Sequence, residues 1–125
     1  MEKSFEQRVT EARAAVPAVT PQEANERRAK NPDTLFIDPR NAADIISTGI
    51  IPGALNLQLN ALSEAADADL LKTLASRTRP IIASCGAGPM GALAAHALKQ
   101  RGFNNVSFID GGTQGWLDAG FSTAQ

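Results

Sequence analysis

The sequence predicts a single α/β domain in which a mainly parallel central sheet is flanked by helices on both faces. Short apolar segments of strand length, rich in Val, Ile and Phe, alternate along the chain with longer segments of helical pattern. The 125 residues are 43% hydrophobic and 20% charged, which suits one globular core. Strands that alternate with helices pair in parallel, and the helices then cover both faces of the sheet.

The first half of the chain is predicted to hold three helices and two strands. In order, these are helix 2–15, helix 21–30, strand 34–38, helix 41–48 and strand 54–57. Thr20, Pro21 and Glu23 have the spacing of an N-cap, a proline at the first helical position and a capping-box glutamate, so they place the start of the second helix. Within the short third helix, Ile45 and Ile46 are expected to face the core.

The second half is predicted to continue the alternation. Its elements are helix 60–76, strand 79–84, helix 92–101, strand 105–110 and a last helix within 111–117. Gly102 suits the C-terminal cap of the helix that precedes it. Phe108 and Trp116 are expected in the core.

The charge composition argues against nucleic-acid and membrane partners. With 12 Lys and Arg against 13 Asp and Glu, the net charge is -1, and the basic residues are scattered. Residues 1–8 are charged and lack the apolar core of a signal peptide, and no apolar stretch reaches the roughly 18 residues of a membrane span. We therefore expect a cytoplasmic protein that binds neither nucleic acid nor membrane.

Cys85, the only cysteine, is the strongest candidate for a reactive group. It follows the apolar strand 79–84 and opens a glycine-rich loop, residues 86–91, after which a helix begins. The glycines can turn several N–H groups towards one point, and the helix N-terminus adds the positive end of its dipole. Both effects stabilise an anion, so the spacing predicts a thiolate, or an anionic sulfur carried on it, at the carboxyl edge of the sheet.

An inert, buried cysteine is the alternative interpretation, because lone cysteines often serve as small apolar side chains. One cysteine excludes an internal disulfide, and one cysteine with one histidine cannot supply the usual Cys/His zinc site, so no metal is expected. His96 lies mid-helix away from the apolar stripe and is predicted to be a solvated surface residue without a catalytic role.

Three regions of the chain resemble the rhodanese family of sulfurtransferases. They are Phe36–Arg40 with Gly49–Ala54, similar to Asp-x-Arg and Gly-His-Ile-Pro-Gly-Ala; Cys85–Gly88, similar to Cys-x-x-Gly; and Asp110–Trp116, similar to Gly-Gly-x-x-x-Trp. Ile50 stands where the family usually has histidine. The resemblance implies a rhodanese-like domain over residues 18–125, preceded by an N-terminal helical extension, residues 1–17.

The resemblance also implies a reaction. Cys85 would take a sulfane sulfur from a small donor such as thiosulfate or a persulfide, hold it as a persulfide, and pass it to a thiol or cyanide acceptor. The substrate-binding loop would comprise Gly86, Ala87, Gly88, Pro89, Met90 and Gly91. Asp38 and Arg40 are expected to support the loop through an ion pair or hydrogen bonds. No metal or organic cofactor is implied, and a protein partner is left open.

The loop departs from the family at Met90 and Gly91, where active sulfurtransferases commonly carry Arg or Thr followed by Ser or Thr. An arginine offers up to five donors to an oxyanion, and a charged hydrogen bond contributes about 1.5–3 kcal/mol. Pro89 lacks an N–H, which removes one more donor. The sequence therefore predicts weak use of thiosulfate.

Two other functions stay open at this point. Met90 is compatible with a catalytically impaired rhodanese fold that serves as a binding or regulatory module. A phosphatase or arsenate reductase is less favoured, because such loops place an arginine after Cys and five further residues to surround a tetrahedral oxyanion. That position is Gly91 here, and the next arginine is Arg101.

Overall fold

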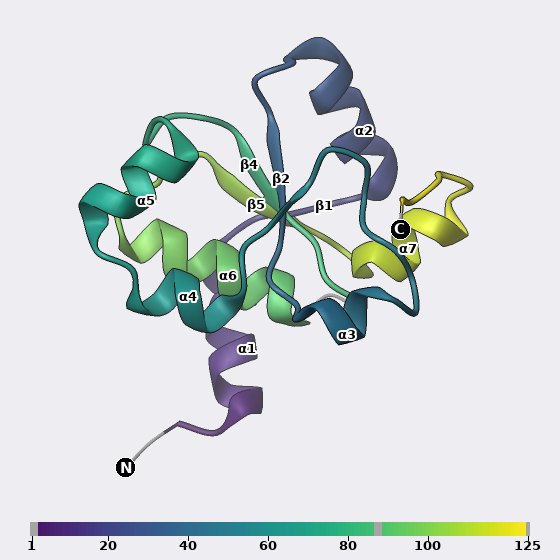
Figure 1. Cartoon of the computed structure of the whole chain (residues 1–125). Coiled ribbons are helices and arrows are strands. Elements are labelled where there is room, and N and C mark those ends of the chain that lie inside the picture. The colour runs from purple at the N-terminus through teal and green to yellow at the C-terminus, as the bar shows by residue number, and fades with distance from the viewer. Residues whose placement is uncertain (1–2, 87–88, 125) are drawn as a thin grey trace.

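The computed structural model describes residues 3–86 and 89–124, which form an α/β structure (Figure 1). In chain order the elements are α1 (Phe5–Ala15), β1 (Ala18–Val19), α2 (Pro21–Lys30), β2 (Leu35–Asp38), α3 (Ala42–Ile45), β3 (Leu55–Asn56), α4 (Leu59–Glu64), α5 (Asp67–Leu74), β4 (Ile81–Ala83), α6 (Pro89–Gln100), β5 (Val106–Ile109) and α7 (Gly112–Asp118). The predicted fold class is confirmed.

The strands form one sheet in the order β1-β5-β4-β2-β3, and every neighbouring pair is parallel. β4 lies at its centre, between β5 and β2. Because all strands run in the same direction, their carboxyl ends meet at one edge of the sheet and their amino ends at the opposite edge. Each edge therefore gathers residues that are distant in sequence.

The two faces of the sheet carry separate cores. Ile81 and Ala83 of β4 pack with residues of α1, α4, α5 and α6, whereas Ile82 packs on the other face with Phe36 and Trp116. Figure 1 shows α1, α4, α5 and α6 grouped on one side and α2 and α7 on the other. Burial of Trp116 and Phe108 confirms their predicted core positions. A strand buried on both faces reads as a continuous apolar run, as β4 does.

Local capping explains where the second helix begins. The Thr20 hydroxyl accepts a hydrogen bond from the Glu23 amide at 3.0 Å, and the Glu23 carboxylate accepts one from the Thr20 amide at 3.2 Å. This is the capping box that the sequence predicts, with Pro21 as the first helical residue.

β1 is a strand that the apolar pattern does not predict. Its two residues, Ala18 and Val19, pair with Phe108 and Ile109 of β5. Two residues are too few to show strand periodicity, so only pairing with β5 identifies them as a strand.

Residues 60–76 form two helices, α4 and α5, so the prediction of one helix is wrong. The chain is extended at Ala65, with ψ of 146°, and α5 begins two residues later. Arg101 donates to the carbonyl oxygens of Ser63, at 2.7 Å, and of Ala65. A side chain from the end of α6 thus satisfies carbonyl groups that α4 leaves unpaired where it ends.

The prediction that Ile45 and Ile46 face the core is also wrong for Ile46, which is 70% exposed. α3 spans only four residues, so it has no complete apolar face, and Ile45 is half-buried. Ile51, a few residues further on, is 1% exposed and supplies the apolar contact to the core around Trp116.

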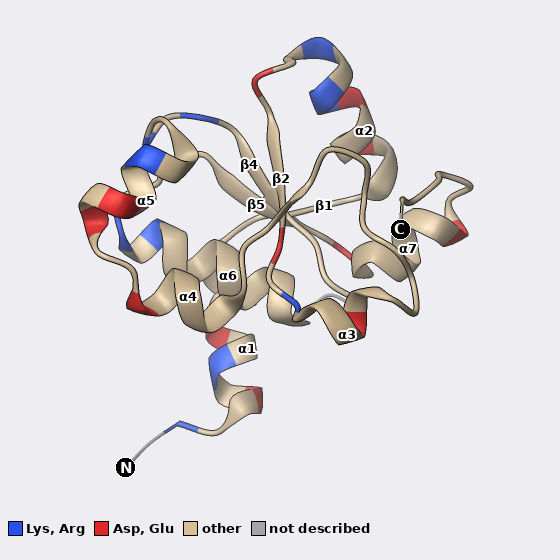
Figure 2. Ribbon diagram, viewed as in Figure 1, with Lys and Arg blue, Asp and Glu red and all other residues tan. Residues whose placement is uncertain are grey.

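Charged residues of both signs are interspersed along α1, α2 and α5, whereas β1, β3, β4 and β5 carry none (Figure 2). Of the helices that the structure describes, none is long and apolar enough to cross a membrane.

We expect Ile51→Ala to lower the free energy of unfolding by about 2–5 kcal/mol, because it leaves a cavity in the core. Ile46→Ala removes the same atoms from an exposed side chain and should change stability by less than about 0.5 kcal/mol. Urea denaturation of both variants measures the difference. A similar loss for the two isoleucines would contradict their assigned positions.

Candidate functional site

Cys85 lies at the carboxyl edge of the sheet, two residues after the end of β4 and four before the start of α6. The residue is 3% exposed. The Ser84 amide donates to the Ile37 carbonyl at 2.9 Å, which extends the contact between β4 and β2 up to the residue before the cysteine. The central strand therefore delivers Cys85 to the edge at which parallel sheets usually bind ligands.

A pocket of about 340 Å³ opens over Cys85. Of the predicted loop residues, Cys85, Gly86, Pro89 and Met90 line it, and Ala87 and Gly88 lie outside the described residues. The opposite wall comes from the segment after β2 and consists of Arg40, Asp44, Ser47 and Thr48. The pocket thus joins the cysteine loop to the region around α3. Of the residues in this wall, the sequence predicts only Arg40 as part of the site.

Gly91 has a packing position and does not line the pocket in the part of the chain that the structure describes. A Cβ atom at this residue would lie 3.3 Å from the carbonyl oxygen of Ala83. Glycine lets the first turn of α6 approach the end of β4 closely. The departure at Gly91 therefore concerns the contact between helix and strand.

Asp38 and Arg40 form a buried ion pair behind the pocket. Nε of Arg40 donates to Oδ1 of Asp38 at 3.0 Å, and Nη2 donates to Oδ2 at 2.7 Å. The Arg40 amide also donates to Oδ1 at 3.0 Å. Two parallel charged hydrogen bonds of this kind fix both position and orientation of the guanidinium.

The remaining donors of Arg40 hold the wall of the pocket. Nη1 donates to the Thr48 hydroxyl at 2.8 Å and to the Asp44 carbonyl at 3.3 Å, and Nη2 donates to the Gly49 carbonyl at 3.2 Å. Nε and the other N–H group of Nη2 donate to Asp38, so all five N–H donors of the guanidinium are engaged. Arg40 also places positive charge near the cysteine loop. Its Nη1 would lie 3.7 Å from a Cβ atom added to Gly86. Arg40 has no donor left for a ligand in this conformation.

The other side of the cysteine loop is tied to α7. The Thr113 amide donates to the carbonyl of Cys85, and the Gln114 amide donates to the carbonyl of Gly86 at 2.9 Å. The hydroxyl groups of Ser84 and Thr113 lie 2.8 Å apart in a buried hydrogen bond. The first-turn N–H groups of α7, which have no partner within their own helix, thus hold the loop in place.

Two glycines make this contact possible. Gly111 and Gly112 have φ of 81° and 62°, in the left-handed region where a side chain is disfavoured. The turn they form brings Thr113 under Cys85. Sequence reasoning missed Ser84, Thr113 and Thr48, although the glycine pair before Thr113 was a signal of a special turn at this place.

Asp44 places a negative charge at the rim of the pocket. Its side chain is exposed, and its carboxylate has neither an ion-pair nor a hydrogen-bond partner among residues 3–86 and 89–124. A carboxylate here repels a doubly charged oxyanion such as thiosulfate, most strongly at low salt.

His96 lies away from this pocket and is less exposed than the prediction of a solvated surface residue implies. It is half-buried and lines a second pocket with Glu11 of α1 and Leu59 of α4. α1 packs along α6, so it covers a helix face that looks polar in the sequence. Within the described ranges, no group of three or more His, Cys, Asp or Glu side chains could hold a metal ion.

The family model of the rhodanese-like domain matches residues 20–119. A rhodanese domain-containing protein of Drosophila melanogaster is 30% identical over 93 residues, which are 69% of this chain and 84% of that protein.

Two solved structures share the fold. A Rhodopseudomonas palustris protein of unknown function, described as a possible tyrosine phosphatase, has a TM-score of 0.80 and 21% identity, covering 99% of this chain and 96% of that chain. The polysulfide-sulfur transferase homodimer of Wolinella succinogenes has a TM-score of 0.73 and 23% identity, covering 96% and 86%. Because the family match spans most of the sequence, including the Asp38–Arg40 pair and the Cys85 loop, the chain belongs to the rhodanese-like domain family.

Proposed function

We propose that the protein is a sulfurtransferase that carries sulfane sulfur as a persulfide on Cys85 and uses thiosulfate poorly. The observation that carries the proposal is the position of Cys85, which lines a pocket at the carboxyl edge of the sheet and lies four residues before the start of α6. Membership of the rhodanese-like domain family supports the same chemistry.

The proposed transfer has two balanced steps. The Cys85 thiolate attacks the outer sulfur of the donor, so that an Sγ–S bond forms and the donor's S–S bond breaks, releasing sulfite from thiosulfate or a thiolate from a persulfide. An acceptor thiolate or cyanide then attacks the outer sulfur and expels the Cys85 thiolate. In each step the leaving group departs with the electron pair of the broken S–S bond and the transferred sulfur keeps its oxidation level, so no external oxidant or reductant is consumed.

The weak use of thiosulfate rests on the charges around the pocket. Arg40 is the only cation lining it among the described residues, and its donors are taken up by protein groups. Met90 provides no charge where an arginine would, and Asp44 adds a negative one. A donor without an oxyanion group, such as an alkyl persulfide, therefore suits the pocket better than thiosulfate.

A phosphatase is the weaker alternative, although one structure that shares the fold is described as a possible tyrosine phosphatase. Phosphate capture needs charged donors aimed at the oxyanion. Arg40 is fully engaged, and Gly91 packs against β4 where such a loop would carry an arginine.

Cys85→Ser should abolish both persulfide formation and sulfur transfer while the fold is retained, because serine has a similar size but cannot carry a sulfane sulfur. Intact mass spectrometry after incubation with thiosulfate, an alkyl persulfide or mercaptopyruvate should show one added sulfur atom on the wild type and none on the variant. A wild type that gains no sulfur from any donor would favour the binding-module function. Activity that survives in the variant would exclude Cys85 as the carrier.

Met90→Arg should lower the KM for thiosulfate by roughly tenfold or more, because the new guanidinium donates charged hydrogen bonds to the oxyanion. The gain should shrink as salt rises, since the site is open to solvent. Met90→Gln, of similar length and neutral, is the matched control. Steady-state kinetics with thiosulfate and an alkyl persulfide decide the matter, and equal gains for both donors would show that oxyanion capture is not the cause.

Asp44→Asn should lower the KM for thiosulfate by about two- to fivefold at low ionic strength, as expected for removal of one exposed repulsive charge. The main-chain contacts of Asp44 to Arg40 and Asn41 are unaffected by the change. Kinetics at low and high salt provide the test. An effect that persists at high salt would point to an altered pocket shape instead of charge repulsion.

A further inference from the structure

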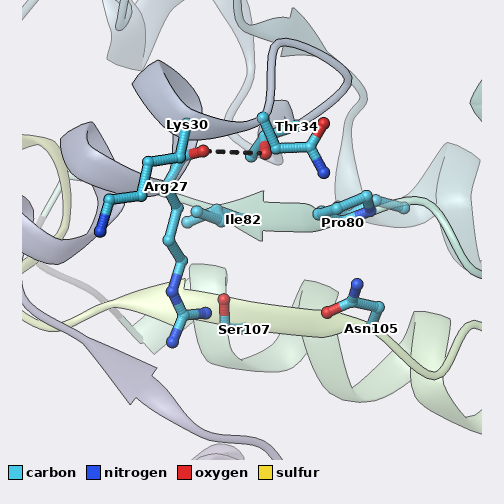
Figure 3. Close-up of a pocket in the computed structure, with 9 residues that line it drawn as sticks. Arg27, Lys30, Thr34, Pro80, Ile82, Asn105 and Ser107 are labelled. Atoms are coloured by element: carbon cyan, nitrogen blue, oxygen red, sulfur yellow. Dashed lines mark hydrogen bonds between the residues drawn. The ribbon is translucent and has the colours of Figure 1, made fainter.

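A third pocket, of about 440 Å³, lies at the edge of the sheet opposite Cys85. It is bounded by the end of α2 and by residues at the start of β2, β4 and β5 (Figure 3). Because these strands are parallel, their starts are separated from the Cys85 pocket by the length of the strands. The sulfur-transfer chemistry proposed above uses no residue of this pocket.

Ser107 is the unusual residue of the pocket. It lies on β5 beside Ile82 of β4 and is 4% exposed, yet its hydroxyl has no hydrogen-bond partner among the described residues. Among the described residues, every fully enclosed side-chain oxygen or nitrogen has a hydrogen-bond partner. The Ser107 hydroxyl is therefore not fully enclosed, and its accessible part faces the pocket that Ser107 lines. The hydroxyl therefore has a donor and an acceptor that no group in the described part of the chain uses and that a ligand in the pocket can engage.

Two cations without carboxylate partners line the pocket. Figure 3 shows the Arg27 side chain extending from α2 past Ile82 towards Ser107. Arg27 and Lys30 form no ion pair and no side-chain hydrogen bond within the described ranges, and the residues that line the pocket include no Asp or Glu. Arg28, by contrast, donates to the Pro52 carbonyl at 2.6 Å. Basic residues do stabilise a helix C-terminus, but that role does not require a cavity or an unpaired serine.

Asn105 supplies a different kind of group. Its amide nitrogen donates to the Thr78 carbonyl at 3.4 Å, and its amide oxygen points along β5 towards Ser107 (Figure 3). This oxygen can accept a hydrogen bond from a hydroxyl. The pocket therefore combines donors and positive charge at one end with an acceptor at the other.

We propose that this pocket binds a small phosphate monoester that carries hydroxyl groups. The phosphate is held by Arg27, Lys30 and the Ser107 hydroxyl. Two cations and a neutral hydrogen-bond donor match a phosphate dianion better than they match a carboxylate anion. Asn105 accepts from a hydroxyl of the ligand, and Pro80 and Ile82 provide apolar contact to its carbon skeleton.

The test is a titration of the ¹⁵N-labelled full chain followed by amide chemical shifts, with ribose 5-phosphate, ribose, inorganic phosphate and acetate as probes. Ribose 5-phosphate should give saturable amide shifts at Lys30, Thr34, Asn105 and Ser107. Inorganic phosphate should bind more weakly at the same residues, and shifts caused by ribose or acetate should not saturate. Shifts spread over all basic surfaces without saturation would overturn the proposal. Acetate binding as tightly as phosphate would overturn the assignment to phosphate.

Variants separate the site from general charge attraction. Arg27→Gln combined with Lys30→Gln should weaken binding of ribose 5-phosphate by roughly tenfold or more, and Ser107→Ala by about three- to tenfold. Lys72→Gln, an exposed lysine of α5 outside the pocket, removes one charge and should leave the affinity unchanged. An equal loss with Lys72→Gln, or unchanged affinity in Ser107→Ala, would contradict the site. Persulfide formation on Cys85 should be the same in all these variants.

Discussion

The buried ion pair between Asp38 and Arg40 is the interaction on which the geometry of the cysteine pocket depends. Both charges are almost completely removed from water, so each requires the other, and loss of one partner from such a pair costs about 3–5 kcal/mol. Asp38 ends β2, and Arg40 holds the segment that follows up to Gly49. The pair thereby connects the sheet to the wall of the pocket that faces Cys85.

The cysteine loop is supported from its other side by α7. Amides in the first turn of that helix donate to the carbonyl groups of Cys85 and Gly86, and Thr113 bonds to Ser84 below them. The loop is therefore held between the segment after β2 and the segment after β5. In a parallel sheet, the carboxyl ends of neighbouring strands meet, so three distant parts of the sequence can position one thiol.

The two edges of the sheet use cations differently. At the carboxyl edge, the donors of Arg40 are engaged by carbonyl, hydroxyl and carboxylate groups of the protein, so the guanidinium acts on the framework of the pocket. At the amino edge, Arg27 and Lys30 have no carboxylate near them among the described residues that line the pocket. What a charged side chain can offer a ligand depends on which intramolecular partners already occupy its donors.

The sequence alone determined the α/β class, the capped start of α2, the buried strand that leads to Cys85 and the membership signalled by its motifs. These features are local, since periodicity, capping boxes and glycine loops act within a few residues. Tertiary structure alone decided the β1–β5 pairing, the break between α4 and α5 where Arg101 donates to Ser63, the exposure of Ile46 and the partial burial of His96 beside α1. It also decided the partners of Arg40 and the support of Cys85 by Thr113, because these contacts join residues that only the folded chain brings together.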